Sequence, residues 1–109
     1  MRETTPTNIR LILGNIYNGL CQECSFTFLK RNNSPYFEIH HLNSALGHHP
    51  KNLVLVCSNC HRKFEYAYVQ TSFNIDGWLM KVNFNETEYH INQAITKLAK
   101  DEFIKTVYL

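Results

Sequence analysis

Two Cys-x-x-Cys pairs are the residues in this chain whose type and spacing most clearly indicate chemistry. Cys21 and Cys24 form the first pair, and Cys57 and Cys60 form the second. A gap of two residues lets a tight turn aim both sulfurs at one ion, and two such pairs suit a tetrahedral metal with Zn–S bonds of about 2.3 Å. Four free thiols or two disulfides are the alternatives, but the duplicated spacing favours zinc. The sequence therefore predicts a structural Zn²⁺ site.

The segment between the two pairs is longer than in a simple zinc ribbon. It holds 32 residues, whereas ribbon pairs are typically separated by about 15–20. A strand–loop–strand unit inserted between the two pairs would explain the extra length. The zinc would then clamp the base of that unit.

A second set of polar residues lies in this segment and just after it. His40 and His41 are adjacent, Asn52 precedes a short apolar run, and His61 directly follows the second cysteine pair. Imidazole is the side chain best suited to proton transfer near neutral pH, and it is also a common metal ligand. Hydrolysis of a phosphodiester needs an activated water, stabilisation of the phosphate charge and help for the leaving oxygen. The set could supply each of these.

The order of these residues resembles that of the HNH endonucleases, also called His-Me finger or ββα-metal nucleases. The resemblance covers about residues 21–66 and implies hydrolysis of DNA, most simply double-stranded DNA. It implies that His41 is the general base and that Asn52 orients the loop and this base. It also implies a catalytic divalent metal, Mg²⁺ or Mn²⁺, held by His40 and His61. An imidazole-rich site could also take nickel, cobalt or zinc.

Glu65 departs from the pattern of the similar nucleases, which often carry a histidine four residues after the helix-start histidine. Glu65 shares a helix face with His61, so it is either a third metal ligand or a partner of a nearby surface cation. Neighbouring residues of a strand point to opposite faces. We therefore expect His40 and His41 to diverge, in keeping with their different roles.

Charge gives weaker indications. The net charge is +2, with a balance of +3 over residues 1–66 and −1 over residues 67–109. A basic first part would suit contact with phosphates, but charge alone favours ordinary surface variation as the explanation. The candidate DNA contacts, each with a solvated surface position as the alternative, are Lys30, Arg31, Lys51, Arg62 and Lys63. The remaining histidines, His48 and His49 in a loop and His90 near the C-terminus, are expected to be polar surface residues.

Hydrophobic periodicity predicts the elements that must position these groups. We expect a helix from Thr7 to Tyr17 capped by Thr7, and strands from Tyr36 to Leu42 and from Leu53 to Val56. A helix should then run from Ser58 or Asn59 to about Val69, with Phe64 and Tyr68 on one face.

The C-terminal part should hold a hairpin and a further helix. Asp76-Gly77 lies between apolar arms and predicts the hairpin turn. Asn85 followed by Glu88 resembles a helix-capping arrangement, and Ile91, Ile95 and Leu98 have helical spacing. Phe73, Trp78 and Phe84 are expected to build a small core.

Together these signals predict one α+β domain over residues 1–109: a small zinc-stabilised ββα-metal core at about 21–69, an N-terminal helix at about 7–18, and a C-terminal hairpin and helix at about 70–109. Hydrophobic residues make up 44% of the chain and aromatic residues 13%, as in folded proteins. The sequence has no apolar run long enough for a membrane helix and no signal-like N-terminal run, so we expect an intracellular, cytoplasmic protein with reduced thiols.

The main functional alternative to the endonuclease is a zinc-stabilised module that binds DNA or protein without cleaving. An endonuclease acting on RNA is a third hypothesis. Residues 70–109 could also form a homodimer interface, which would let two single-strand cuts become a double-strand break.

Overall fold

Two short antiparallel strands lie at the centre of the fold. They are β1 (Glu38–His41) and β2 (Leu53–Val56), paired so that His40 faces Val54 across the strands and His41 faces Leu53. The structure is a computed structural model, and it describes residues 5–97. β2 begins and ends as predicted, whereas β1 is shorter than the predicted strand from Tyr36 to Leu42. All four residues of β2 are buried because both faces of this sheet are covered.

One face of the central sheet is covered by the N-terminal helix, α1 (Thr7–Tyr17), which has the predicted bounds. Its Leu13 and Tyr17 pack in a buried cluster with Leu53 and Leu55 of β2. Thr7 does not cap the helix. Pro6 occupies the cap position, without a side-chain hydrogen bond, and its φ of −55° leads directly into the first helical turn.

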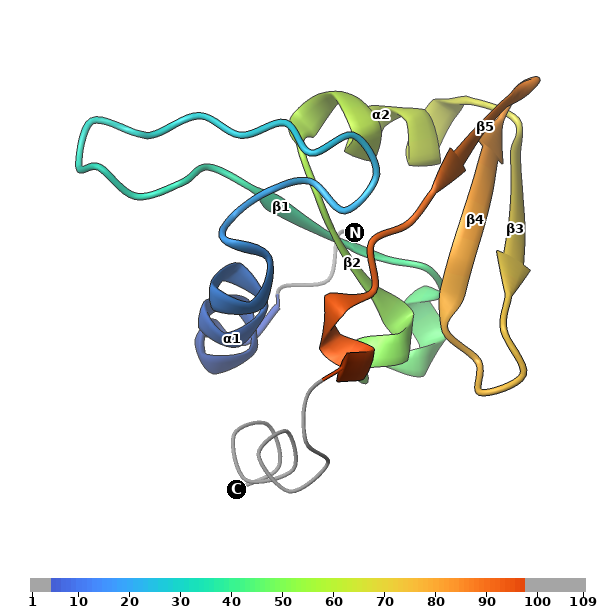
Figure 1. The fold of residues 1–109 in the computed structure, drawn as a ribbon, viewed down its shortest axis with the longest axis horizontal. Helices are drawn as coiled ribbons and strands as arrows, with labels where there is room; N and C mark the ends of the chain where they lie inside the picture. Colours follow the sequence, from blue (N-terminus) through green and yellow to red (C-terminus); the bar gives the residue numbers. More distant parts are fainter. Residues whose placement is uncertain (1–4, 98–109) are drawn as a thin grey trace.

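The opposite face of the central sheet is covered by α2 (Ser58–Tyr66), so that β1, β2 and α2 form a ββα unit (Figure 1). The helix begins where predicted but ends at Tyr66 rather than near Val69. Ala67 turns extended, with φ −80° and ψ 164°, and leads into the next strand. Tyr68 therefore lies outside the helix and is 67% exposed, so the predicted sharing of a helix face with Phe64 is wrong.

The C-terminal part forms a second antiparallel sheet, with β4 (Leu79–Phe84) between β3 (Val69–Phe73) and β5 (Thr87–His90). The predicted turn at Asp76-Gly77 joins β3 to β4, and Gly77 there has a φ of +91°. The predicted helix cap at Asn85 is wrong. Asn85, with a φ of +58°, makes a tight turn from β4 into β5, a backbone region that asparagine tolerates.

In the described part of the predicted last helix, the chain forms a 3-10 turn at Ala94–Lys97. Ile91 and Ile95 are both buried, but they belong to different core clusters. Leu98 lies outside the described residues. The three predicted aromatic core residues also differ in position: Phe84 is 4% exposed and Trp78 is half-buried, whereas Phe73 is 51% exposed.

An extended arm, residues 25–37, leaves the body of the protein between the first cysteine pair and β1 (Figure 1). Leu29 and Pro35 form an isolated antiparallel bridge within it. The base of the arm is fixed by close contact between Pro35 and Gly19, where an added Cβ would lie 2.4 Å from Pro35 Cβ and where φ is +70°. Only glycine satisfies both conditions. Within residues 5–97, no helix combines the length and the apolar character needed to cross a membrane.

Candidate metal centre and active site

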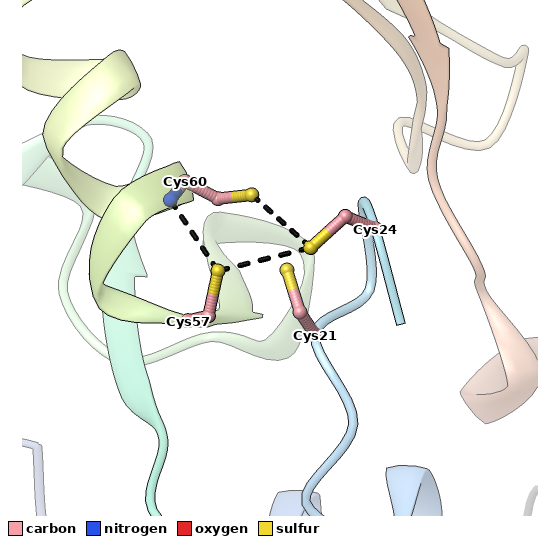
Figure 2. Close-up of side chains that lie close together, drawn as sticks. All are labelled: Cys21, Cys24, Cys57 and Cys60. Atoms are coloured by element: carbon pink, nitrogen blue, oxygen red, sulfur yellow. Dashed lines mark hydrogen bonds between the residues drawn. The ribbon is translucent and has the colours of Figure 1, made fainter. Parts of the chain in front are cut away.

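The four cysteines converge at one point beside the N-terminus of α2 (Figure 2). Their sulfur atoms all lie within 4.8 Å of one another. Cys24 Sγ is 3.7 Å from Cys57 Sγ and 3.6 Å from Cys60 Sγ. A tetrahedron with Zn–S bonds of about 2.3 Å has edges of about 3.8 Å. The cysteine cluster is therefore positioned to hold a metal ion.

The local backbone explains why both pairs point inward. Ser25 N–H donates to Cys21 C=O at 2.8 Å and closes the first turn, with Ser25 at a φ of +66°. Cys57 is the N-cap residue of α2, and its sulfur accepts from the backbone N–H of Cys60. A hydrogen bond with the Cys60 thiol lowers the pKa of Cys21 to about 4. The cluster thus favours at least one thiolate, which is the form that binds metal.

Gln22 docks the first cysteine pair onto the central sheet. Its backbone N–H donates to Leu55 C=O at 2.9 Å, and its side-chain oxygen accepts from Leu55 N–H at 2.7 Å. Its side-chain amide also donates to the carbonyl of Asn92 at 2.6 Å. Gln22 is 4% exposed, so these bonds are shielded from water and tie three distant segments together.

Next to the cluster, Glu23 carries a fully buried carboxylate whose pKa is raised by burial. The ammonium of Lys63 lies 3.6 Å from one of its oxygens and 3.3 Å from the hydroxyl of Tyr89. It also lies over the ring of Tyr89, 4.7 Å from its centre. Lys63 is thus engaged inside the fold, and its contact with DNA stays a prediction.

His61 is the buried centre of the histidine site. It is 4% exposed, and its Nδ1 lies 2.6 Å from Glu38 Oε1. A carboxylate can only accept, so Nδ1 donates its hydrogen to Glu38. Nε2 lies 3.5 Å from Glu65 Oε1. Tyr36 completes the network by donating its hydroxyl to the other oxygen of Glu38 at 2.6 Å.

Glu65 lies near both kinds of neighbour that the sequence suggested for it, a proposed metal-binding histidine and a surface cation. Besides its approach to His61, its Oε2 lies 3.5 Å from the guanidinium of Arg62. The side chain of Arg62 is 65% exposed, so this pair contributes little to stability.

His40 lies on the same strand face as Glu38 and points toward α2. Its ring stacks on Phe64 at 4.4 Å between centres and meets the ring of His61 edge-on at 5.2 Å. The structure thus brings together His40 and His61, the two residues that the resemblance assigned to a catalytic metal, and Glu65, whose role the sequence left open.

His41 points to the opposite face, as the strand alternation predicts. It lies opposite Leu53, whose side chain packs in the cluster on the α1 side of the sheet. Its Nε2 lies 3.0 Å from His48 Nδ1, a hydrogen bond between two imidazole rings. The two adjacent histidines of the dipeptide therefore face different surroundings.

Asn52 holds the loop between β1 and β2 in place. Its side chain accepts from Asn43 N–H at 2.9 Å and donates to the carbonyls of Asn43 at 2.9 Å and Gly47 at 2.7 Å. Its own carbonyl accepts from Leu42 N–H next to the dipeptide. Because Asn52 is 5% exposed, these bonds fix the loop that carries His48.

The remaining predicted site residues are spread over the surface. Lys30 and Arg31 are exposed at the end of the arm, and Lys51 is exposed beside Trp78. His49 accepts from the backbone N–H of Lys51. His90 is in β5, where its side chain is 77% exposed and 3.8 Å from Glu88, in line with the expected surface role.

Two residues of this site were missed from the sequence. Glu38 stands two residues before His40 and so shares its strand face, a signal that could have identified it. His48 had no comparable signal, because only the folded loop brings it to His41.

Comparison with known proteins supports the resemblance. The model of the HNH endonuclease family matches residues 21–65. Among solved structures, a modification-dependent TagI restriction endonuclease matches with a TM-score of 0.63 and 17% identity over 94% of this chain. The chain spans 37% of the length of that protein. No curated protein matches the chain.

These matches confirm the resemblance to HNH endonucleases over residues 21–65 and the α+β fold. At 17% identity the structural match concerns the fold alone. The roles of individual residues, the metals and the substrate are addressed next as proposals.

Proposed function

We propose that this protein is a metal-dependent endonuclease that hydrolyses phosphodiester bonds of DNA. The observation that carries the proposal is the convergence of His40, His61 and Glu65 on one side of β1, with His41 emerging from the same strand on the other. The family match over residues 21–65 supports the same reaction class. The named activity of the TagI restriction endonuclease makes DNA the first substrate to test.

The donor set of the histidine site fits a catalytic divalent metal. Metal-binding histidines almost always donate their second ring N–H to a carboxylate or carbonyl, and Glu38 accepts in this way from His61. His40, His61 and Glu65 would hold the ion, two by imidazole and one by carboxylate. Mg²⁺ or Mn²⁺ is the proposed cellular ion. When bound, it would act as a Lewis acid on the scissile phosphate and the departing oxygen.

His41 is the proposed general base. It would take a proton from a water molecule as the water oxygen forms its bond to phosphorus and the bond to the leaving oxygen breaks. The leaving oxygen is protonated from solvent. The hydrogen bond to His48 fixes the ring orientation of His41 and links its tautomer to that of a second imidazole. Asn52 holds the loop that makes this contact possible.

The cysteine cluster is proposed to bind a structural Zn²⁺. Four sulfurs with tetrahedral spacing form a closed site, which leaves no position for substrate. The ion would join the start of α2, which carries His61, to the base of the arm. It would thereby fix the helix that presents two of the proposed catalytic metal ligands.

DNA contacts are proposed at Lys30, Arg31, Lys51, Arg62 and Lys63. Lys30 and Arg31 are exposed at the turn that ends the arm. Each phosphate contact removed should lower the slope of log affinity against log salt by about 1. A homodimer through residues 70–109 stays a further proposal.

The decisive experiment is cleavage of supercoiled plasmid DNA with Mg²⁺ or Mn²⁺ added to the zinc-loaded protein. His41→Ala should reduce the rate by about 10²–10⁴-fold, the usual contribution of a general base. His90→Ala is the matched control, because its side chain is exposed on β5, and it should cleave like the wild type.

Equal rates for wild type and His41→Ala would reject His41 as the base. DNA binding without cleavage under every metal tested would favour the non-catalytic module instead. A parallel assay on RNA of the same sequence would decide between the two nucleic acids.

A further inference from the structure

A pocket of about 690 Å³ opens beside His40, and nothing in the proposed reaction has used it. It lies between the loop after β1, helix α2 and strand β3, and we name it the β3 pocket. Its walls include, among others, His40, Lys51, Asn52, Phe64, Thr71 and Phe73. The volume falls within the range of about 300–1,000 Å³ that is usual for small-molecule sites.

The β3 pocket joins two regions that are far apart in sequence. Val69, Thr71 and Phe73 are alternate residues of β3 and face the pocket together. On the other side, Lys51 belongs to the loop that Asn52 fixes. The aliphatic part of the Lys51 side chain passes Gly77, where an added Cβ would lie 3.6 Å from Lys51 Cδ. The ammonium of Lys51 lies 5.7 Å from the centre of the Trp78 ring. The turn between β3 and β4 therefore holds a cation at the pocket rim.

The chemistry of the walls points to one kind of occupant. None of the described residues that line the pocket is acidic, and Lys51 supplies a positive charge. Phe73 offers an aromatic ring that is 51% exposed, which is unusual for a phenylalanine in a sheet. An aromatic ring and a cation in the walls of one pocket could bind a nucleotide, with stacking for the base and charge for the phosphate.

We propose that the β3 pocket receives the nucleoside next to the scissile phosphate, with its base or sugar against Phe73 and the adjoining phosphate near Lys51. This inference rests on the proposed function, because a phosphate at His40 would place the attached nucleoside in the neighbouring space. Strand β3 of the C-terminal sheet would thus form one side of the substrate-binding site, in addition to the ββα unit. Binding of the nucleoside there would orient the phosphate for attack.

The first test compares two chromogenic phosphodiesters that share a leaving group. One is the p-nitrophenyl ester of thymidine 5′-phosphate, and the other is methyl p-nitrophenyl phosphate, which has no nucleoside. Phe73→Ala should lower kcat/KM for the thymidine ester by about tenfold, the effect of losing one stacking contact. It should leave the methyl ester unchanged. Ile75→Ala is the matched control, since Ile75 is fully exposed in the same hairpin and does not line the pocket.

The second test separates this inference from the proposed function. Binding of a short fluorescein-labelled DNA duplex is measured by anisotropy without added divalent ion, for the wild type, Phe73→Ala and Ile75→Ala. A loss of affinity in Phe73→Ala alone supports the pocket even if the wild type cleaves nothing, in which case only the proposed function fails. Unchanged binding together with equal effects on both esters overturns the pocket. A wild type that neither binds nor cleaves overturns both.

A different occupant of the β3 pocket would give a different experimental result. If Phe73→Ala converts a dimer into a monomer in sedimentation experiments without changing DNA affinity, the pocket is a contact between copies of the chain, and the nucleoside assignment is wrong. Circular dichroism checks that the variant is folded, which its exposed position leads us to expect.

Discussion

The cysteine cluster and the histidine site are adjacent in the sequence, because Cys60 of the cluster is followed directly by His61. They differ in the kind of donor that they contain and in their access to a pocket. The cysteine cluster has one kind of donor, with sulfurs at tetrahedral spacing. The histidine site combines two imidazoles with carboxylates, and it borders an open pocket. A closed set of identical donors can only hold a metal, whereas a mixed set beside a pocket can also admit substrate.

The supporting contacts differ in the same way. The cysteines are fixed by backbone turns and by Gln22, which ties them to β2. The histidines are fixed by other side chains that can gain or lose protons, namely Glu38 for His61 and His48 for His41. The comparison therefore predicts that damage to the first region acts on folding, and that damage to the second acts on activity.

The largest effect should follow from Cys60→Ser. Cys60 is 1% exposed, and the substitution would remove one of the four proposed zinc ligands. Structural zinc in small domains binds with apparent free energies of about 10–16 kcal/mol, and much of this stabilises the fold. We expect loss of stoichiometric zinc by elemental analysis and loss of a cooperative thermal transition by circular dichroism. Ser58→Ala, at an exposed neighbouring position, is the control. A Cys60→Ser protein with the same thermal transition as the wild type would contradict the structural role of the cysteine cluster.

His40→Ala should come next. The variant should keep its zinc and its thermal transition, because His40 is only partly buried and the cysteine cluster is made of Cys21, Cys24, Cys57 and Cys60. Cleavage of plasmid DNA should fall by roughly 10²–10³-fold, as when one stabilising group is removed from a reacting centre. A matching loss of stability and activity would mean that the two regions are not separable.

Glu38→Gln should have an intermediate effect. The amide keeps the shape of the side chain but weakens the hold on His61, and loss of such outer partners typically costs about 10–100-fold in metal affinity or activity. We expect the Mn²⁺ concentration that gives half-maximal cleavage to rise, while the rate at saturating Mn²⁺ largely recovers. Tyr36→Phe, which removes a hydrogen-bond donor to Glu38, should raise the required Mn²⁺ concentration as well, but by less. A cleavage rate of Glu38→Gln that does not rise with the Mn²⁺ concentration would contradict the proposed role of Glu38 in orienting His61.

The smallest effect should come from His48. His48→Ala should lower kcat about tenfold, at the lower end of the range for outer partners, with KM for DNA unchanged. His48→Asn keeps an acceptor close to the position of Nδ1 and should restore part of the rate. If both variants reduce kcat equally, His48 acts only through the shape of the loop and not through its bond to His41.

Much of the fold could be predicted because local signals agreed with the tertiary structure. α1 and β2 have the predicted bounds, and α2 has the predicted start. One incorrect secondary-structure prediction lies where strand pairing determined the conformation of the chain. Asn85 and Glu88 satisfy a helix-capping pattern, but β4 offers a strand partner from Lys81 to Phe84, and the chain pairs with it instead. This pairing is local, because only Asn85 and Glu86 separate Phe84 from its partner Thr87. The same few residues therefore fit both a helix cap and a hairpin turn, and the cap pattern alone could not decide between them.

The amino-acid sequence by itself determined the donors: two cysteine pairs, the adjacent histidines, Asn52 and His61, each in an order that fixed the family resemblance. It also determined that His40 and His41 would diverge, because strand alternation is a local property. Only the tertiary structure decided which groups support them. The contacts of Glu38 with His61, of His48 with His41 and of β3 with the pocket all join segments whose approach depends on packing, and packing is set by the whole chain rather than by any one motif.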